Sequence, residues 1–198
     1  DDALPLDEAG SRLDMTPVNA ADGAPPAGPI LLHFGVDLDP AQLTTAHELA
    51  RSLADENPIA LFNYDTGARV PFMAEMDRNR KDDYPDRYAL IVRPMEPMEM
   101  GQRHLVALRR DLTAADGQIL ESPRAFVALR DRRRTTSAVV EGVRDHYEQL
   151  FAFLGEHGYA RHELLLAWDF VVASEEHLLG PVLAMRETAL ADAAAGKL

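Results

Sequence analysis

Residues 88–118 constrain the fold of this chain more than any other stretch. Two short apolar runs, Tyr88–Val92 and Arg103–Leu108, are separated by a turn that contains prolines and ends at Gly101. The second run leads toward Asp116-Gly117, a dipeptide that favours a tight reversal between antiparallel strands. This spacing predicts two neighbouring antiparallel strands, and with them a β-sandwich.

Other short runs fit the same architecture. We expect four further strands, at Pro29–Phe34, Pro58–Asn63, Arg69–Met73 and Arg124–Leu129. Pro71 would confine the third of these to the edge of a sheet, because proline cannot donate to a strand ladder. Among the connections, residues 1–28 form an extended lead-in with a short strand at Leu13–Met15, residues 41–53 form a short helix, and residues 76–86 form an exposed loop.

The apolar period changes after Arg130. Helical spacing of Val139, Val143, Tyr147, Leu150 and Leu154 predicts a helix over residues 138–154, with Ser137 as its N-cap and Gly155 or Gly158 as its stop. Residues 164–172 are nearly all apolar, which is typical of a strand buried on both faces. With strand 124–129 before the helix, a right-handed crossover would make the last two strands parallel.

A final helix should follow this strand. Ser174 is placed to cap it, and Glu175 and Glu176 suit the positive end of its dipole. Pro181 should kink or restart it. The chain is therefore predicted to be mainly β, with an Ig-like antiparallel β-sandwich over residues 1–130 and a helix–strand–helix extension over residues 131–198.

Composition excludes several classes of function. The 198 residues include 20 Lys and Arg against 33 Asp and Glu, a net charge of −13, which disfavours binding to nucleic acid or to an anionic membrane surface. The absence of cysteine excludes disulfides, thiolate metal sites and cysteine nucleophiles. No apolar run approaches the ~20 residues of a membrane-spanning helix. The opening Asp1-Asp2 lacks the features of a signal peptide, so we expect any such peptide to have been removed.

No catalytic motif is visible in the sequence. A serine hydrolase of the α/β type places its nucleophile in G-x-S-x-G, and none of the five serines stands in that pattern. Ser174 follows an apolar strand, precedes a helix and has His177 nearby. Its neighbours Glu175 and Glu176 would oppose an alkoxide, however, and we interpret it as a helix cap.

The sequence also predicts no metal or cofactor site. H-E-x-x-H is absent; His157 and His162 flank a glycine-containing loop and would meet there, but two ligands do not make a zinc site. His33 and His104 lie in strands and are expected to pack. Oxygen-rich spots are interpreted as turns, with structural calcium as the one metal left open: Asp37 with Asp39, Asp82 with Asp83 and Asp86, and Asp111 with Asp116.

The one cationic cluster is Arg130-Asp131-Arg132-Arg133-Arg134. We interpret it as a salt-bridged joint between the strand-rich and helical parts, with an anion site as the alternative. Asp169 lies within the apolar run 164–172 and needs donors if it is buried. The nearby arginines are expected to supply them.

Several segments together resemble a known family. These are Gly28–Phe34, Asp37-Leu38-Asp39, Tyr88–Pro94, Gly101–Leu108, Asp116–Gln118, Phe126–Asp131, His146-Tyr147, Leu166–Ser174 and Met185–Glu187. The chain resembles the N-terminal Ig-like region of secreted bacterial proteins, often lipoproteins, in which this region precedes an α/β-hydrolase domain of the lipase or esterase type. The resemblance covers about residues 1–190. Because residues 10–28 look shortened and the catalytic domain is absent, no catalytic residue carries over.

The resemblance implies a non-catalytic part of an extracellular or cell-surface hydrolase of ester or lipid bonds, which scaffolds the catalytic part or frames its substrate entrance. Its partner would be the α/β-hydrolase domain or chain, and alone it should be sticky or form homo-oligomers. Two alternatives stay open. One is a stand-alone Ig-like interaction or adhesion module of the cell surface. The other is an enzyme complete in this chain, using Ser174 with His177 or a carboxylate pair.

Overall fold

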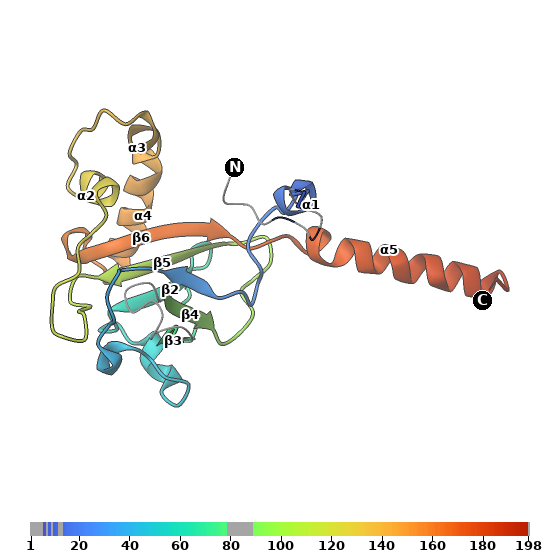
Figure 1. Ribbon diagram of the computed structural model, residues 1–198, viewed down its shortest axis with the longest axis horizontal. Coiled ribbons are helices and arrows are strands. Elements are labelled where there is room, and N and C mark those ends of the chain that lie inside the picture. The colour runs from blue at the N-terminus through green and yellow to red at the C-terminus, as the bar shows by residue number, and fades with distance from the viewer. Residues whose placement is uncertain (1–5, 7, 9, 12–13, 79–88, 198) are drawn as a thin grey trace.

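Two antiparallel sheets form the body of the protein (Figure 1). The computed structural model describes residues 6, 8, 10–11, 14–78 and 89–197. Within these residues the first sheet has the strand order β1-β4-β3 and the second the order β2-β5-β6. The strands are β1 (Ile30–Leu32), β2 (Ile59–Asn63), β3 (Phe72–Met76), β4 (Leu90–Pro94), β5 (Arg103–Arg109) and β6 (Leu164–Val171). The predicted β-rich, antiparallel character is confirmed.

The predicted strand pair of residues 88–108 is wrong. β4 pairs with β1 and β3, whereas β5 pairs with β2 and β6. The connection between them carries Met98, which is 3% exposed, and Gly101, whose φ is +72°. It therefore crosses from one sheet to the other instead of reversing within one. The later Asp-Gly turn is confirmed: Gly117 has φ +82°, and the Ala114 N–H donates to the carbonyl of Gln118 at 2.9 Å.

The two sheets pack face to face around an apolar core. Phe72, Leu90 and Val92 of the first sheet are fully buried, and so are Val106 and Leu108 of the second. β3 is an edge strand, as Pro71 predicted, although it begins at Phe72 and extends further than expected. Because Phe72, Ala74 and Met76 alternate with half-buried residues, this strand has one core face and one outer face.

A helical layer covers the outer face of the second sheet. It consists of α2 (Arg124–Arg130), α3 (Ala138–Gly142) and α4 (Arg144–Glu156). β2 is buried on both faces: Ile59 and Leu61 contact the core between the sheets, whereas Ala60 and Phe62 contact the helices. The body is therefore built of three layers, sheet on sheet on helices.

Residues 124–129 are helical, so the predicted strand there is wrong. Phe126 and Leu129, three positions apart, both reach the second core, and Ala128 and Arg130 are buried beside them. A six-residue apolar run does not by itself distinguish a strand from one and a half turns of helix. Pro123 directly precedes α2, as is common at the start of a helix.

The predicted parallel crossover is also wrong. β6 runs antiparallel to β5, with Val106 opposite Trp168 and Ala107 opposite Ala167, and α2 is not its partner strand. β6 is thus the outer strand of the second sheet. Leu164, Leu165 and Ala167 are fully buried, which confirms the predicted burial at its start, but its last residues are half-buried or exposed.

The helix predicted over residues 138–154 is broken at Val143 into α3 and α4. Ser137 caps α3 as expected, accepting from the Val140 N–H, and Gly158 with φ +84° follows the end of α4. Val139 is 78% exposed, because α3 turns away from the sheet, whereas Leu150 and Leu154 of α4 are fully buried.

The remaining elements are short. They are α1 (Thr16–Asn19) and the 3-10 helices η1 (Pro40–Gln42), η2 (Leu49–Leu53) and η3 (Arg161–Glu163). Residues 41–53 therefore hold 3-10 turns in place of the expected α-helix. Of the expected strand Leu13–Met15, Leu13 lies outside the described residues and Met15 is not in a strand; residues 79–86 of the expected loop, and Tyr88, also lie outside them.

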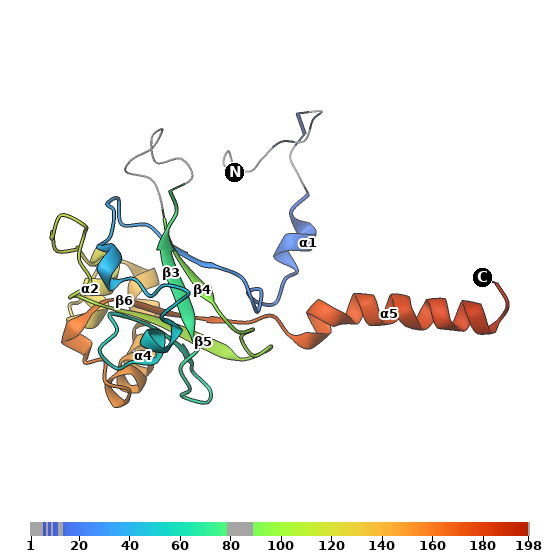
Figure 2. The same cartoon turned by 90° about the horizontal axis from the view of Figure 1, so that it is seen from below.

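The final helix α5 (Glu175–Ala194) projects away from the body (Figure 2). Ser174 caps it as predicted, accepting from the His177 N–H at 3.1 Å. Pro181 lies inside the continuous helix, so the predicted restart does not occur. Pro181 is in the second turn, where it removes one intrahelical hydrogen bond. None of the 20 residues of α5 is buried.

Candidate functional site

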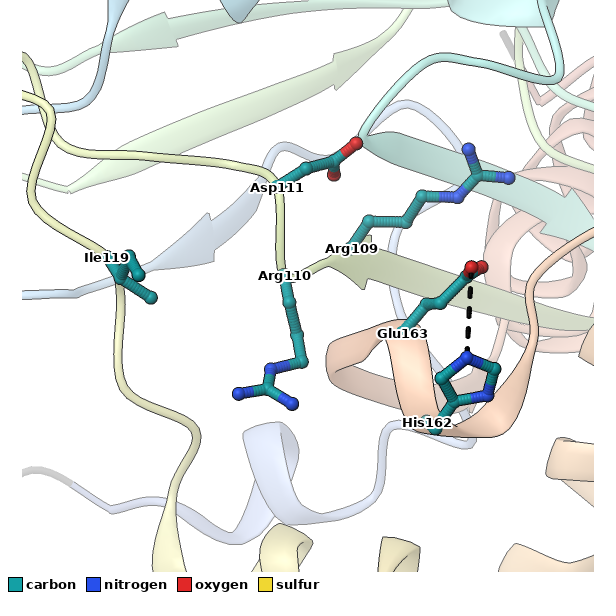
Figure 3. A pocket seen from close by; sticks show the side chains of 6 residues that line it. All are labelled: Arg109, Arg110, Asp111, Ile119, His162 and Glu163. Carbon is teal, nitrogen blue, oxygen red and sulfur yellow. Dashed lines mark ion pairs between the residues drawn. The ribbon is translucent and has the colours of Figure 1, made fainter.

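An open depression of about 440 Å³ lies where β5 ends against η3 (Figure 3). The turn after β5 and the 3-10 helix are held together by the Arg110 N–H, which donates to the carbonyl of Glu163 at 2.8 Å. The lining side chains are Arg109, Arg110, Asp111, Ile119, His162 and Glu163. Every lining side chain except Ile119 is ionisable, and we therefore asked what chemistry these groups allow.

Arg109 and Arg110 have different roles there. Arg109 donates to the carbonyl of Gly158 at 2.7 Å and lies 4.2 Å over the ring of Tyr159, so it holds the end of α4 against the sheet. Figure 3 shows the Arg110 side chain turned away from Arg109, into the open space between Ile119 and His162. Burial raises the pKa of Tyr159, whose hydroxyl donates to the carbonyl of Asn57.

The depression has no catalytic arrangement. Its two arginines are matched by Asp111 and Glu163, so it has no net charge with which to attract an anion. His162 Nε2 lies 3.9 Å from Glu163 Oε1 with both side chains largely exposed, and such surface pairs contribute little. None of the lining residues carries a hydroxyl or thiol nucleophile. We therefore assign no reaction to this depression.

The basic run at residues 130–134 forms the predicted salt-bridged joint. Arg130 is buried and donates to the carbonyl of Leu164 at 2.8 Å and to Asp131 at 2.7 Å, which ties α2 to β6. Its hydrogen bond holds the pKa of Asp131 below the ordinary value. Arg132 pairs with Glu148 at 3.3 Å, and Arg134 with Glu141 at 2.9 Å.

Arg161, which the sequence did not single out, is the centre of this joint. Its guanidinium donates to the carbonyls of Leu129 and Arg130 at the end of α2 and forms two hydrogen bonds, of 2.6 and 2.7 Å, with Glu148 of α4. It also lies 4.2 Å over the ring of Phe151. The bond from Arg161 lowers the pKa of Glu148. A planar fork of donors suits this geometry better than a lysine would.

Asp169 is not paired with the basic run, and that prediction is wrong. Its carboxylate lies 2.8 Å from His146 Nε2 and 3.4 Å from Arg103 Nε. The reason is the register of β6: Asp169 lies opposite Leu105, on the face that α4 covers, whereas Arg130 contacts the start of the strand. No hydroxyl of the described residues forms a hydrogen bond with His146.

Ser174 and His177 do not form a catalytic pair. The Ser174 hydroxyl accepts the backbone N–H of His177, and the Ser174 N–H donates to Asp22 Oδ1 at 3.1 Å. A hydrogen bond from the Ser174 side chain, together with this backbone contact, lowers the pKa of Asp22. The side chain of Ser174 is thus used to begin α5, as the interpretation as a cap requires.

The other histidines occupy separate environments. His104 is fully buried and stacks on Phe170, with ring centroids 6.0 Å apart, as expected. The same expectation is wrong for His33, which follows the end of β1 and is exposed. His157 stacks on Phe153 at 4.1 Å, and its Nδ1 lies 2.7 Å from the Phe153 carbonyl. His162 instead faces Glu163, so the structure does not bring His157 and His162 together as ligands.

The oxygen-rich spots that the structure describes serve turns. Asp39 caps η1, Asp37 forms an ion pair with Arg78 at 2.9 Å, and Asp116 accepts from the Gln118 N–H. Asp82, Asp83 and Asp86 lie outside the described residues. Within the described residues no three His, Asp or Glu side chains gather as metal ligands would.

Comparison with known proteins yields no match, either to a family model or to a curated protein. None of the helices in the described part of the chain is long and apolar enough to cross a membrane. The assignment of function therefore rests on the residues and their geometry.

Proposed function

We propose that this chain is a non-catalytic part of an extracellular bacterial hydrolase of ester or lipid bonds. In this proposal the three-layer body is a scaffold, an α/β-hydrolase part is its partner, and the body frames the entrance for the substrate. We further propose that the two facing antiparallel sheets are a variant of the Ig-like sandwich. The resemblance of the sequence to such secreted regions supports both statements.

The observation that carries the proposal is α5. Its apolar side chains Val182, Met185 and Leu190 are 58%, 64% and 64% exposed, and Leu179 and Leu183 are each 39% exposed. At about 100° per residue these positions lie within an arc of about 160°, on one side of the helix. An apolar face of this kind usually packs against another part of a structure.

Burial of α5 would stabilise a complex substantially. Each large apolar side chain moved from water into a protein interior contributes about 2 kcal/mol. Most of the stability of a helix in a protein comes from packing of its apolar face, and no residue of α5 is buried. We therefore propose that the catalytic part of the hydrolase packs against the apolar side of α5.

The arrangement of polar groups supports a non-catalytic role. Ser174 serves as a helix cap, and the His146–Asp169 pair has no bonded hydroxyl among the described residues. Both arrangements that would support catalysis within this chain therefore lack one component. A self-sufficient adhesion module remains the second candidate, and the groove described below is the observation that favours it.

The test combines the gene and the protein. Sequencing the reading frame on both sides of residues 1–198 should reveal G-x-S-x-G followed by Asp and His, in the same gene or in its neighbour. The purified chain should not hydrolyse p-nitrophenyl butyrate above the buffer rate, and Ser174→Ala should change nothing. Hydrolysis that is lost in Ser174→Ala would show instead that the chain is a complete enzyme.

A second measurement tests the role of α5 once that hydrolase part is known. Val182→Asp and Met185→Asp together should weaken its co-purification with this chain, because two buried apolar contacts become charged. The exposed Val139 of α3 provides the matched control, since Val139→Asp alters an equally exposed residue far from α5. Equal retention of all variants would contradict the proposal.

A further inference from the structure

An apolar groove lies on the open side of the sandwich, between β1 and β6. It consists of two depressions, of about 270 and 350 Å³, that share Leu31 and Trp168. The first is lined only by apolar residues and glycine, among them Phe170 and Met98. The second adds Leu166 and has His33 and Glu121 as its polar members. Because the two depressions share residues, they form one continuous surface.

Each strand beside the groove has an edge without a strand partner. Within the described residues β1 pairs only with β4, and β6 pairs along its length only with β5. The direction in which each peptide group of β6 points follows from the hydrogen bonds of its neighbours. The Val172 N–H donates to the Gln102 carbonyl beside β5, whereas the Val171 carbonyl accepts from Ala24 on the other side.

Alternation of hydrogen bonding therefore directs the backbone groups of Asp169 and Val171 away from β5. Leu165 and Ala167, earlier in the strand, are fully buried. Val171, in contrast, is 43% exposed. The accessible part of the edge is thus the second half of β6, from Trp168 to Val171, directly beside the groove.

One residue of the chain already uses this edge as a strand would. Ala24 donates its N–H to Val171 and accepts from the Ala173 N–H, each at 2.8 Å, which makes a parallel bridge with Val172. The pairing ends after this single residue. Pro25 and Pro26 follow, and neither has an N–H to continue the ladder. The edge therefore accepts extended main chain and leaves most of its length unused.

We propose that the groove binds an extended peptide segment of a partner protein, which pairs with the outward N–H and carbonyl of Asp169 and the N–H of Val171 on β6. The segment places an apolar side chain at every second residue over Trp168 and Leu31. Added strands of this kind gain affinity from main-chain bonds and specificity from pockets for alternate side chains. The groove supplies both features together. An acyl chain would fill the apolar lining but has no groups for the peptide edge.

The opposite face of β6 also favours a segment in which apolar and polar residues alternate. Asp169 points to the helical side, where it contacts His146 and Arg103. The residues of the bound segment that lie between its apolar positions would therefore face polar and charged groups. The net charge of −13 favours a segment with basic flanks.

A second copy of this chain fits the groove less well. Filling it requires an extended apolar segment, but the largest group of exposed apolar side chains in the described chain lies on α5, a helix. The inference does not depend on the proposed hydrolase function, because α5 and the groove share no residue. Failure of either proposal leaves the other standing.

The single tryptophan of the chain makes the test direct, because Trp168 lies in both depressions. The probe is a capped peptide that alternates Val and Thr between terminal lysines, titrated against the whole chain. Binding should shift the Trp168 emission to shorter wavelength in a saturable manner, because the indole loses contact with water. The same peptide methylated on every second backbone nitrogen should not bind, since it cannot donate to β6.

Leu31→Ser should weaken binding about tenfold, because one exposed leucine in contact with the peptide is lost. Leu31 is 62% exposed, so its replacement should leave the fold intact. Leu190→Ser is the matched control: that leucine is 64% exposed but lies on α5, and its replacement should leave the affinity unchanged.

Four results would overturn the proposal. The first is that millimolar peptide does not shift the Trp168 emission, and the second is that the methylated peptide binds equally well. The third is that dodecanoate shifts the emission but the peptide does not. The fourth is concentration-dependent self-association that shields Trp168. The third would assign the groove to an acyl chain, and the fourth to a second copy of this chain.

Discussion

At the scale of single residues, His104 is a buried polar group whose hydrogen bonding is incomplete. It is fully buried on β5; its Nδ1 lies 3.3 Å from the Gln102 carbonyl, whereas Nε2 has no hydrogen-bond partner. Burial therefore lowers the pKa of His104 below 6.5. In the unfolded chain the same imidazole is solvated and takes up a proton at a higher pH.

We predict that His104 makes the fold sensitive to mild acid. The unfolded chain binds the proton first, so the free energy of unfolding should fall as the pH drops below about 6.5 toward the lower pKa of the folded state. His104→Phe should remove this slope between about pH 6.5 and 5, above the range in which carboxylates titrate. Urea titrations at several pH values measure the effect.

The His104→Phe substitution should leave the contacts around position 104 largely unchanged. Phenylalanine keeps the stacking on Phe170, and the Gln102 carbonyl still accepts from the Val172 N–H at 3.0 Å. We expect a cost of about 1 kcal/mol at neutral pH. His162→Gln, at a side chain that is 83% exposed, should leave the slope as it is. An unchanged slope in His104→Phe would assign the acid sensitivity to other groups.

At the scale of elements, the joint between α2, α4 and η3 depends on Arg161. We predict that Arg161→Lys lowers the free energy of unfolding by about 2 kcal/mol, because a lysine cannot reach two helix-end carbonyls and both oxygens of Glu148 at once. Arg132→Lys is the control. It touches the same carboxylate from a side chain that is 73% exposed, and should change stability by less than about 0.5 kcal/mol.

The contribution of the Arg161–Glu148 pair to the free energy of unfolding should depend on pH in one direction. The Arg161 bond lowers the pKa of Glu148, so its stabilisation is present above the unfolded value of 4.5 and is lost as the pH falls through the folded value. The difference between the natural chain and Arg161→Lys should therefore shrink below about pH 4.5. A difference that stays constant into acid would attribute the effect to packing on Phe151 instead.

The elements also show what a single sequence could predict. The positions of six predicted strands, the Ser137 and Ser174 caps and the Asp116-Gly117 turn follow from local rules, and these predictions were confirmed. The identity of residues 124–129 was not decidable locally, because Phe126 and Leu129 suit a strand as well as a helix. Which strands pair was equally undetermined: the connection after β4 crosses between sheets because Met98 is buried in the core, a tertiary fact.

The candidate sites show the same division. The arginine run at 130–134 was recognisable as a joint from its charges alone. The partners of Asp169 were not, because they depend on the register of β6 against β5, which brings His146 of α4 over this strand. The groove beside Trp168 is formed by two strands more than a hundred residues apart in the sequence, so no local pattern predicts it.

At the scale of the whole molecule, the body and α5 differ in how they are stabilised. The body has one core between its sheets and a second beneath its helices, whereas α5 has no buried residue. Among the described residues, a hydrogen bond joins the two at the start of the helix, where the Ser174 N–H donates to Asp22. The stability of the body should therefore depend little on α5.

We therefore predict that a chain ending at Ser174 keeps the stability of the full chain. Its free energy of unfolding in urea should agree within about 1 kcal/mol, because no residue of α5 is buried. The helical signal in circular dichroism should fall by the contribution of 20 residues. Removal of Val182, Met185 and Leu190 should also reduce self-association in sedimentation experiments, since these side chains are exposed. A large loss of stability would show that α5 supports the body directly, and would remove the argument that it is kept for a partner.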